Sequence, residues 1–300
     1  MSSQPTKDRR VFFALLIAVT AISFAAIFFR KSEGTHPLVA AGIRLLIAAV
    51  LLSPLVVRGL RRKTFDGRAL RLAALAGLAY AAHFGTWVWS LSLTTVAASV
   101  TLVTATPLLL AVYAVVRGKD QPARHHWFAV GLALIGVSLI GSADSGNPSA
   151  LVGDGLAFVG AASMAVYMLL ARHAGEKLDV WAFTGVATFV GAVVLLSIAL
   201  VGGVPIAFES EAAFFYIVLA ALVPQIIGHS LLTWSLRHTR PTVVGIATVG
   251  EPVGSAFLGW LWLGEHVGLL AAIGCLVTIG AVVLALVGGS SGTSKPRKAE

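Results

Sequence analysis

The chain has 300 residues, of which 57% are hydrophobic and only 12% are charged. Soluble domains carry about 25% charged residues, so this composition excludes an ordinary soluble domain and indicates a protein embedded in a lipid bilayer. The net charge of +9 comes from basic residues that flank apolar segments, which indicates membrane topology and argues against nucleic-acid binding.

Apolar segments of the length that crosses a hydrocarbon core recur along the chain between short polar breaks. We therefore predict an all-α integral membrane protein with ten transmembrane helices, surrounded by membrane lipid. In chain order the predicted spans are Val11–Phe29, Leu38–Val57, Leu72–Leu91, Val96–Val116, Trp127–Gly141, Leu151–Ala171, Val180–Val201, Ala212–Leu236, Val243–Leu263 and Val267–Val287. The first span follows basic residues, as a secretory signal does, but the nine later spans favour a helix that is retained.

The spans divide the chain into two five-helix repeats with a tail at each end. Residues 1–10 form a cytoplasmic N-terminal tail, 11–145 the first repeat and 146–288 the second repeat. Residues 289–300 belong to a basic, Gly/Ser-rich end that we predict to be disordered and cytoplasmic.

The distribution of lysine and arginine predicts the orientation of the spans. With the N-terminus inside, 19 of the 22 basic residues fall in cytoplasmic segments, and only Arg30 and Lys31 fall outside. Both termini and the loops around Arg62 and Lys119 are then cytoplasmic, whereas the loops that hold Asp144 and Glu209 are external. We predict a multi-pass protein of the plasma membrane, which in bacteria is the inner membrane.

A weak internal repeat is visible when the chain is compared with itself at a shift of 145 residues. This shift places the "WSL" of 89–91 on the "WSL" of 234–236, Pro107 on Pro252, and Asp120 on Glu265. Because five spans are an odd number, the second repeat must cross the membrane in the opposite direction. The charges agree, since "VVRGKD" after the fourth span is basic and "WLWLGE" after the ninth is acidic.

Pro107 and Pro252 fall halfway along the fourth and ninth spans. Each proline removes a helical hydrogen bond and frees the carbonyl four residues earlier, at Val103 and Thr248. Free backbone at this depth is tolerated where it is buried in protein or lines a wet cavity, and matched breaks in inverted repeats indicate a carrier with a midplane substrate site. The alternative is that each proline only kinks a packed helix.

Three stretches carry a family resemblance: "EPVGSAFLGWLWLGE" at 251–265, its weaker copy "TPLLLAVYAVVRGKD" at 106–120, and "GIRLLIAAVLL" at 42–52. They resemble the repeated pattern of EamA-type carriers in the drug/metabolite transporter superfamily. Within it, the chain resembles bacterial amino-acid exporters of the YddG kind. The resemblance implies export of small metabolites, such as amino acids, by alternating access. The first copy departs from the pattern, because it has Thr106 where the second copy has Glu251.

Polar and aromatic residues at helical spacing are the candidates for substrate contact. Tyr80, His83 and Trp87 share one face of the third span, and an aromatic wall with a few polar groups suits an apolar or aromatic amino acid. The full set of predicted substrate-binding residues is Tyr80, His83, Trp87, Tyr113, Ser163, Tyr167, Gln225, His229 and Glu251. Interhelical hydrogen bonds are the alternative role for such side chains.

Two charged residues lie within predicted spans. Glu251 could satisfy backbone groups at the break of Pro252, accept a substrate amine, or carry a coupling proton, and the sequence favours the first role. For Arg44 we expect snorkelling or a structural ion pair, with a substrate carboxylate as the alternative partner.

Other functional classes have weaker support in the sequence. His125 and His126 are adjacent and cannot share a helical face, and His83 with His229 lacks a third ligand, so we predict no metal and no other cofactor. Intramembrane protease motifs and a channel filter motif are not present, which leaves an enzyme or a channel as lower-ranked alternatives. Multidrug or other metabolite efflux is the nearer alternative to amino-acid export.

Overall fold

The computed structural model describes residues 4–62, 65–94, 96–118, 124–141, 148–174, 179–264 and 268–288. Within these ranges all regular secondary structure is helical, which confirms the all-α class. The predicted disordered tail at 289–300 and the predicted loop positions Lys119 and Asp144 lie outside the described residues.

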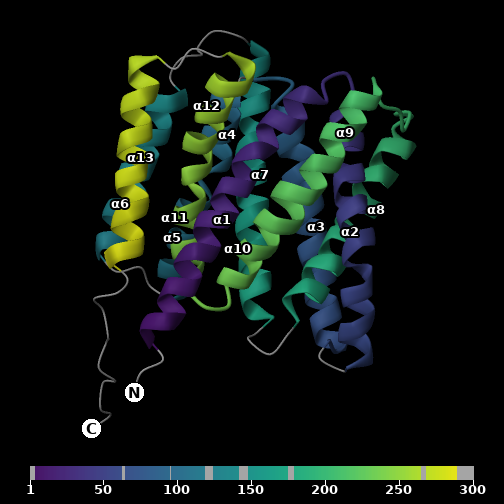
Figure 1. Ribbon diagram of the computed structural model, residues 1–300, viewed down its shortest axis with the longest axis horizontal. Coiled ribbons are helices and arrows are strands. Elements are labelled where there is room, and N and C mark those ends of the chain that lie inside the picture. Colours follow the sequence, from purple (N-terminus) through teal and green to yellow (C-terminus); the bar gives the residue numbers. More distant parts are fainter. Residues whose placement is uncertain are drawn as a thin grey trace.

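Short non-helical segments separate the helices (Figure 1). In chain order the helices are α1 (Gln4–Lys31), α2 (Pro37–Arg61), α3 (Gly67–Ser90), α4 (Val96–Val103), α5 (Thr106–Arg117), α6 (Arg124–Gly141), α7 (Pro148–His173), α8 (Val180–Val201), α9 (Glu211–Ala220), the π-helix η1 (Ala221–His229), α10 (Ser230–Ser235), α11 (Pro241–Thr248), α12 (Gly250–Leu263) and α13 (Leu269–Gly288).

Six helical segments of the described chain are each long and apolar enough to cross a bilayer. They are Arg9–Lys31, Pro37–Arg61, Ala150–His173, Val180–Val201, Glu211–Ser235 and Pro241–Leu263. Thr106–Arg117 and Ala272–Leu284 are shorter apolar helices. The remaining four predicted spans correspond to α3, to α4 with α5, to α6 and to α13, so the count of ten stays a prediction.

Both proline-containing spans are divided where the sequence predicts a break. Residues 104–105 separate α4 from α5, and Val249 separates α11 from α12. The structure adds a third irregular span, within the predicted span Ala212–Leu236, where the sequence predicts no break. There α9 passes into η1, which contains Pro224, and then into α10. Proline cannot donate to the carbonyl of the preceding turn, and a π-helical segment accommodates this loss by widening the turn.

The helix contacts follow the pattern of two related halves. α2 packs along α8 and α6 packs along α13, so each of these pairs joins equivalent helices of the two repeats. α3 packs on α7, and the equivalent segments α9, η1 and α10 pack on α1. In Figure 1 the α6–α13 pair lies at one edge of the bundle and the α2–α8 pair at the other, with the broken helices between them.

Small residues allow the helices at one edge of the bundle to approach closely. A Cβ placed on Gly77 of α3 would lie 2.6 Å from Cβ of Val190 and 2.7 Å from the carbonyl oxygen of Ala187, both on α8. A Cβ on Gly185 of α8 would lie 2.5 Å from Val56 of α2. Close approach of this kind is how helices associate in lipid, where no hydrophobic force drives them together.

Polar residues fix the ends of several helices. The carboxylate of Asp66 accepts from the backbone N–H of Ala69 at 2.8 Å at the start of α3, and Asp179 caps α8 in the same way. Gly118 and Gly264 end α5 and α12 with φ of 62° and 67°, a left-handed conformation that favours glycine. The equivalent helices of the two repeats therefore end with the same cap.

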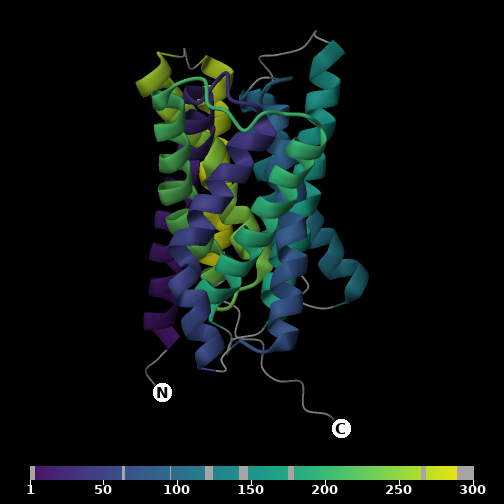
Figure 2. The same ribbon diagram turned by 90° about the vertical axis from the view of Figure 1, so that its right-hand side faces the viewer.

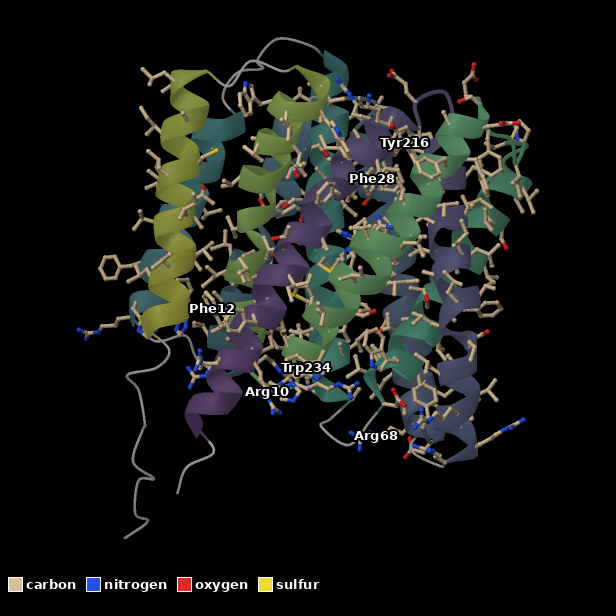
Figure 3. The ribbon with its side chains drawn as sticks, in the orientation of Figure 1. Arg10, Phe12, Phe28, Arg68, Tyr216 and Trp234 are labelled. Atoms are coloured by element: carbon tan, nitrogen blue, oxygen red, sulfur yellow. The ribbon has the colours of Figure 1, made fainter. Side chains whose placement is uncertain are left out.

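The two ends of the bundle differ in charge. Arg10 and Arg68 lie at one end, where the first residues of α1 and the last residues of α13 also lie (Figures 2 and 3). Tyr216 lies toward the opposite end. This separation agrees with the predicted concentration of basic residues on one side of the membrane.

Candidate functional site

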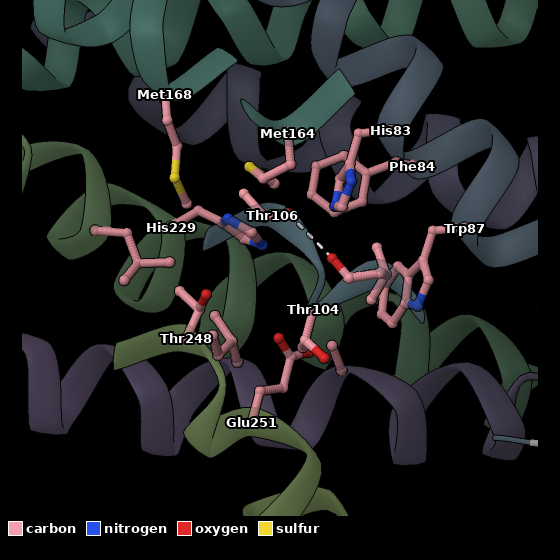
Figure 4. Close-up of a pocket in the computed structure, with 14 residues that line it drawn as sticks. His83, Phe84, Trp87, Thr104, Thr106, Met164, Met168, His229, Thr248 and Glu251 are labelled. Carbon is pink, nitrogen blue, oxygen red and sulfur yellow. Dashed lines mark hydrogen bonds between the residues drawn. The ribbon is translucent and has the colours of Figure 1, made fainter. Parts of the chain in front are cut away.

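A cavity of about 40 Å³ lies between the two halves of the bundle. α1, α3 and α7 form its walls together with η1 and α10, and the breaks of α4–α5 and α11–α12 both border it (Figure 4). The cavity is therefore built where the two predicted proline breaks meet.

One wall of the cavity is the aromatic face of α3. His83, Phe84 and Trp87 line it, with His83 stacked on Trp87 at a centroid distance of 6.0 Å and an interplanar angle of 11°. Nδ1 of His83 donates to the carbonyl oxygen of Gly160 on α7 at 2.9 Å, because that oxygen can only accept. Nε2 of His83 remains as its second polar atom. The indole Nε1 of Trp87 is buried and has no hydrogen-bond partner in the described structure.

The opposite wall carries the polar groups of the two helix breaks. At the first break, Oγ1 of Thr106 donates to the carbonyl of Val103 at 3.0 Å and lies 3.2 Å from the carbonyl of Ala161. The carbonyl freed by Pro107 thus receives a hydrogen bond from a side chain, as buried backbone groups require. At the second break, the hydroxyl of Thr248 donates to Gly245 at 2.6 Å.

Glu251 extends from the start of α12 into the cavity, toward Thr104 (Figure 4). Its backbone carbonyl is 3.5 Å from Oγ of Ser23 on α1, and Ser255 donates to the carbonyl of Ser23 at 3.0 Å. No hydrogen bond joins the Glu251 carboxyl to another residue of the described chain. The hydrogen bonds that a structural role at the Pro252 break would require are therefore not formed, and the carboxyl is left for the cavity.

A second layer of polar residues lies behind the cavity and does not line it. Tyr80 stacks on Tyr167 at a centroid distance of 3.9 Å, and the hydroxyl of Tyr167 bonds that of Thr233 at 2.7 Å. The side chain of Gln225 accepts from Arg44. Of the predicted substrate-binding residues, His83, Trp87, His229 and Glu251 line the cavity, whereas Tyr80, Tyr167 and Gln225 support its wall.

Tyr113 and Ser163 lie away from the cavity. Tyr113 is half-buried on α5, and the hydroxyl of Ser163 donates to the carbonyl of Val159 in its own helix at 2.8 Å. A serine whose hydroxyl donates to the preceding turn has its donor satisfied within its own helix.

Arg44 is fully buried, with 0% of its surface exposed, so the predicted snorkelling is wrong. No carboxylate of the described chain lies within ion-pair distance, and the predicted structural ion pair is not formed either. Nη2 of Arg44 donates to Oε1 of Gln225 at 3.0 Å, and the guanidinium carbon lies 4.3 Å from the centroid of the Phe84 ring. The side chain turns inward because the helix bundle on this face offers an aromatic and amide environment.

Several lining residues were not predicted as site residues from the sequence. Phe84, Met164 and Met168 form much of the apolar surface, and Thr104 lies at the first break. The apolar residues have the spacing of ordinary core positions, so no local signal separates them from packing residues. Thr104 could have been found from its position three residues before Pro107.

A second hollow, of about 280 Å³, lies at the C-terminal end of α3 and is called the outer hollow because the predicted topology places it outside. It is lined by Phe29, by residues 32–37, by Val88 in the last turn of α3 and by Leu91, which follows α3. The rings of Phe29 and Trp87 meet edge to face at a centroid distance of 5.9 Å. Phe29 lines this hollow and Trp87 lines the cavity, so the contact between these two rings lies between the two spaces.

A helical membrane protein whose broken helices meet at a partly polar cavity has the architecture of a secondary transporter. The model of the EamA-like transporter family matches residues 9–142 and 151–287, one match for each repeat. The chain belongs to the EamA-like transporter family.

The fold is shared with solved structures, whereas no curated protein matches the chain. One structure, titled only "Crystal structure of protein", superposes with a TM-score of 0.77 over 95% of this chain and 99% of its own. Its sequence identity is 15%, so the similarity shows the fold alone. Within the described residues, no three His, Cys, Asp or Glu side chains come together as a metal site would require.

Proposed function

We propose that the protein is a secondary transporter that exports small metabolites, namely apolar or aromatic amino acids, by alternating access at the cavity between the two repeats. The observation that carries this proposal is the composition of the cavity. A single carboxyl group, Glu251, faces aromatic and thioether side chains across this cavity. Sites for small ligands typically combine apolar walls with a few placed polar groups.

The walls provide complementary groups for an amino acid. Glu251 accepts the protonated amine, since its carboxyl has no hydrogen-bond partner in the described chain. Phe84, Trp87 and Met168 contact the apolar side chain, because aromatic faces and flexible thioethers adapt to different apolar shapes. Nε2 of His83 supplies a further polar contact.

Two barriers suit alternating access. Phe29 and Trp87 close the cavity toward the outer hollow. The stack of Tyr80 on Tyr167, with the Tyr167–Thr233 hydrogen bond, lies behind the cavity on the side of the basic end of the bundle. Export requires these barriers to open in turn, and the matched breaks of α4–α5 and α11–α12 provide the places where the two halves can move.

The membrane arrangement belongs to the same proposal. Ten spans in two inverted five-helix repeats agree with the equivalent helix pairs and with the matching glycine caps at Gly118 and Gly264. The positive-inside rule then places the basic end, with both termini, in the cytoplasm of a bacterial inner membrane.

Counterflow in proteoliposomes tests the function. Purified protein is reconstituted into vesicles loaded with one unlabelled amino acid, and uptake of the same labelled amino acid is followed for a panel of apolar, aromatic, acidic and basic members. Saturable exchange of apolar or aromatic members is the expected result. The matched controls are protein-free vesicles and Trp260→Ala, which alters a ring that is 53% exposed on the outer surface.

The same assay decides between the proposal and efflux of unrelated compounds. Lipophilic organic cations are added to the panel as substrates and as competitors. Exchange of the cations without exchange of any amino acid would support multidrug efflux and contradict amino-acid export.

A further inference from the structure

We propose that Arg44 binds the carboxylate of the transported substrate, so that the substrate is held as a zwitterion between Arg44 and Glu251. This inference rests on the proposed function and deepens it, because it identifies the carboxylate as the group that the carrier selects. The argument depends on the burial of Arg44, on its unused donors and on the two aromatic rings that enclose it.

The guanidinium of Arg44 has more donors than partners. Its side chain is fully buried, and only Nη2 is bonded, to Oε1 of Gln225 at 3.0 Å. Nε and Nη1 are buried and have no hydrogen-bond partner in the described structure. Buried polar groups are normally bonded, and a buried cation without an anion is costly, so a missing partner at this position calls for an explanation.

A carboxylate is the ligand that fits these donors. It is anionic, and its two oxygens can accept from two guanidinium N–H groups at once. No acidic residue of the described chain supplies this anion within ion-pair distance. Glu251 is not bonded to the guanidinium, whose hydrogen-bonded partner is Gln225.

The position of Arg44 gives a substrate access to it. Its guanidinium carbon lies 4.3 Å from the centroid of Phe84, which lines the cavity, and 5.4 Å from the centroid of Phe29, which lines the outer hollow. Each ring therefore contacts Arg44 and also borders one of the two spaces. Movement of Phe84 exposes the guanidinium to a substrate in the cavity, with the amine of that substrate toward Glu251.

Movement of Phe29 exposes the same guanidinium to the outer hollow. Phe29 also forms the barrier with Trp87, so opening of this barrier and release of the carboxylate involve the same ring. Arg44 is thus placed to interact with the substrate on both sides of the outer barrier.

The first arm of the test uses the wild-type protein. Ligand-induced stabilisation is measured in detergent micelles for two pairs of probes, phenylalanine with phenylalaninamide and leucine with leucinamide, at a pH of about 6 where the amines are protonated. Within each pair only the carboxylate changes to a neutral amide. We expect the acid to bind at least about tenfold more tightly than the amide, as charge-assisted pairs exceed neutral ones.

The second arm uses substitutions of Arg44 and a matched control. In Arg44→Gln the acid is expected to bind no more than about threefold more tightly than the amide. Arg44→Lys is expected to keep part of the preference for the acid, because the positive charge remains although the planar guanidinium is lost. Arg61→Gln removes an exposed arginine from the other end of the same helix and is expected to keep the wild-type preference. If Arg44→Gln does not fold, the comparison of acid with amide binding by the wild-type protein still tests the inference.

The outcomes separate the inference from the function. Equal binding of acid and amide by the wild type, or an unchanged preference in folded Arg44→Gln, overturns the role of Arg44 while amino-acid counterflow still supports the function. An arginine that is only structural gives this result. Absence of counterflow for every amino acid overturns the proposed function, and the role of Arg44 as the carboxylate site then falls with it.

Discussion

The carboxyl group of Glu251 lies in a cavity, and this changes what a substitution there should do. A charge at the centre of a membrane helix costs roughly 2.5–3.5 kcal/mol on insertion scales, so a retained one usually has a function. The sequence alone favours a hydrogen-bonding role at the Pro252 break. The structure forms no such hydrogen bond in the described chain, and the backbone at the first break is satisfied by Thr106 instead.

We therefore expect Glu251→Gln to lose at least about tenfold in amino-acid counterflow, nearly as much as Glu251→Ala, because a neutral amide cannot balance the substrate amine. Counterflow is measured at equal pH on both sides, so no net proton movement is needed. Full exchange by Glu251→Gln would contradict amine binding. Full exchange with loss of pH-driven accumulation would assign a proton-coupling role to Glu251.

The aromatic wall of α3 gives a second prediction at this scale. His83→Ala and Trp87→Ala are expected to impair counterflow about tenfold or more while membrane expression stays near the wild-type level, because both side chains line the cavity. Tyr113→Ala is the matched control, since Tyr113 is an aromatic residue at a span position away from the cavity. If both cavity variants exchange at the wild-type rate, the wall serves packing and the assignment of the site is wrong.

At the scale of the element, the broken helices and the close-packed helices have different tasks. α4–α5 and α11–α12 bring polar groups to the cavity, whereas α2 and α8 form a tightly packed edge with the face of α3 that points away from the cavity. Gly77 marks this edge, because a Cβ there would meet Val190 and a backbone oxygen of α8. Backbone cannot move aside as a flexible side chain can, so the helices must separate.

Gly77→Ala is expected to destabilise the protein by about 1–3 kcal/mol, the usual cost of overpacking. The measurement is the midpoint of thermal unfolding in detergent micelles. Gly131→Ala on α6 is the matched control, because a Cβ there meets nothing within 4 Å, and it should leave the midpoint unchanged or raise it slightly. Equal midpoints for Gly77→Ala and the wild type would show that α3 and α8 are not held this closely.

For the whole molecule, the orientation in the membrane is the property to test. Single cysteines are introduced at Arg62 and at Glu209 in a background in which Cys275 is changed to Ala. In intact cells an impermeant thiol reagent should label position 209 and not position 62, and position 62 should react only after the membrane is opened. The reverse labelling pattern would show that the protein has the opposite orientation in the membrane. The outer hollow would then face the cytoplasm.

The sequence by itself determined that the protein lies in a lipid bilayer, that it is helical, that it contains two repeats and that two spans are broken at proline. Hydropathy, proline and a repeat at a fixed shift are signals along the chain. They can therefore be read without knowing which residues are in contact in the folded protein. They also indicated four residues that line the cavity: His83, Trp87, His229 and Glu251.

Only the tertiary structure decided which face of each helix meets the cavity. Tyr80 and Gln225 share the helical spacing of lining residues, yet they contact Tyr167 and Arg44 behind the wall. Arg44 turned inward, whereas its sequence position was equally compatible with a side chain that reaches the membrane surface. The physical reason is that helical periodicity orders side chains around one axis, whereas the rotation and depth of that axis depend on packing against the other helices.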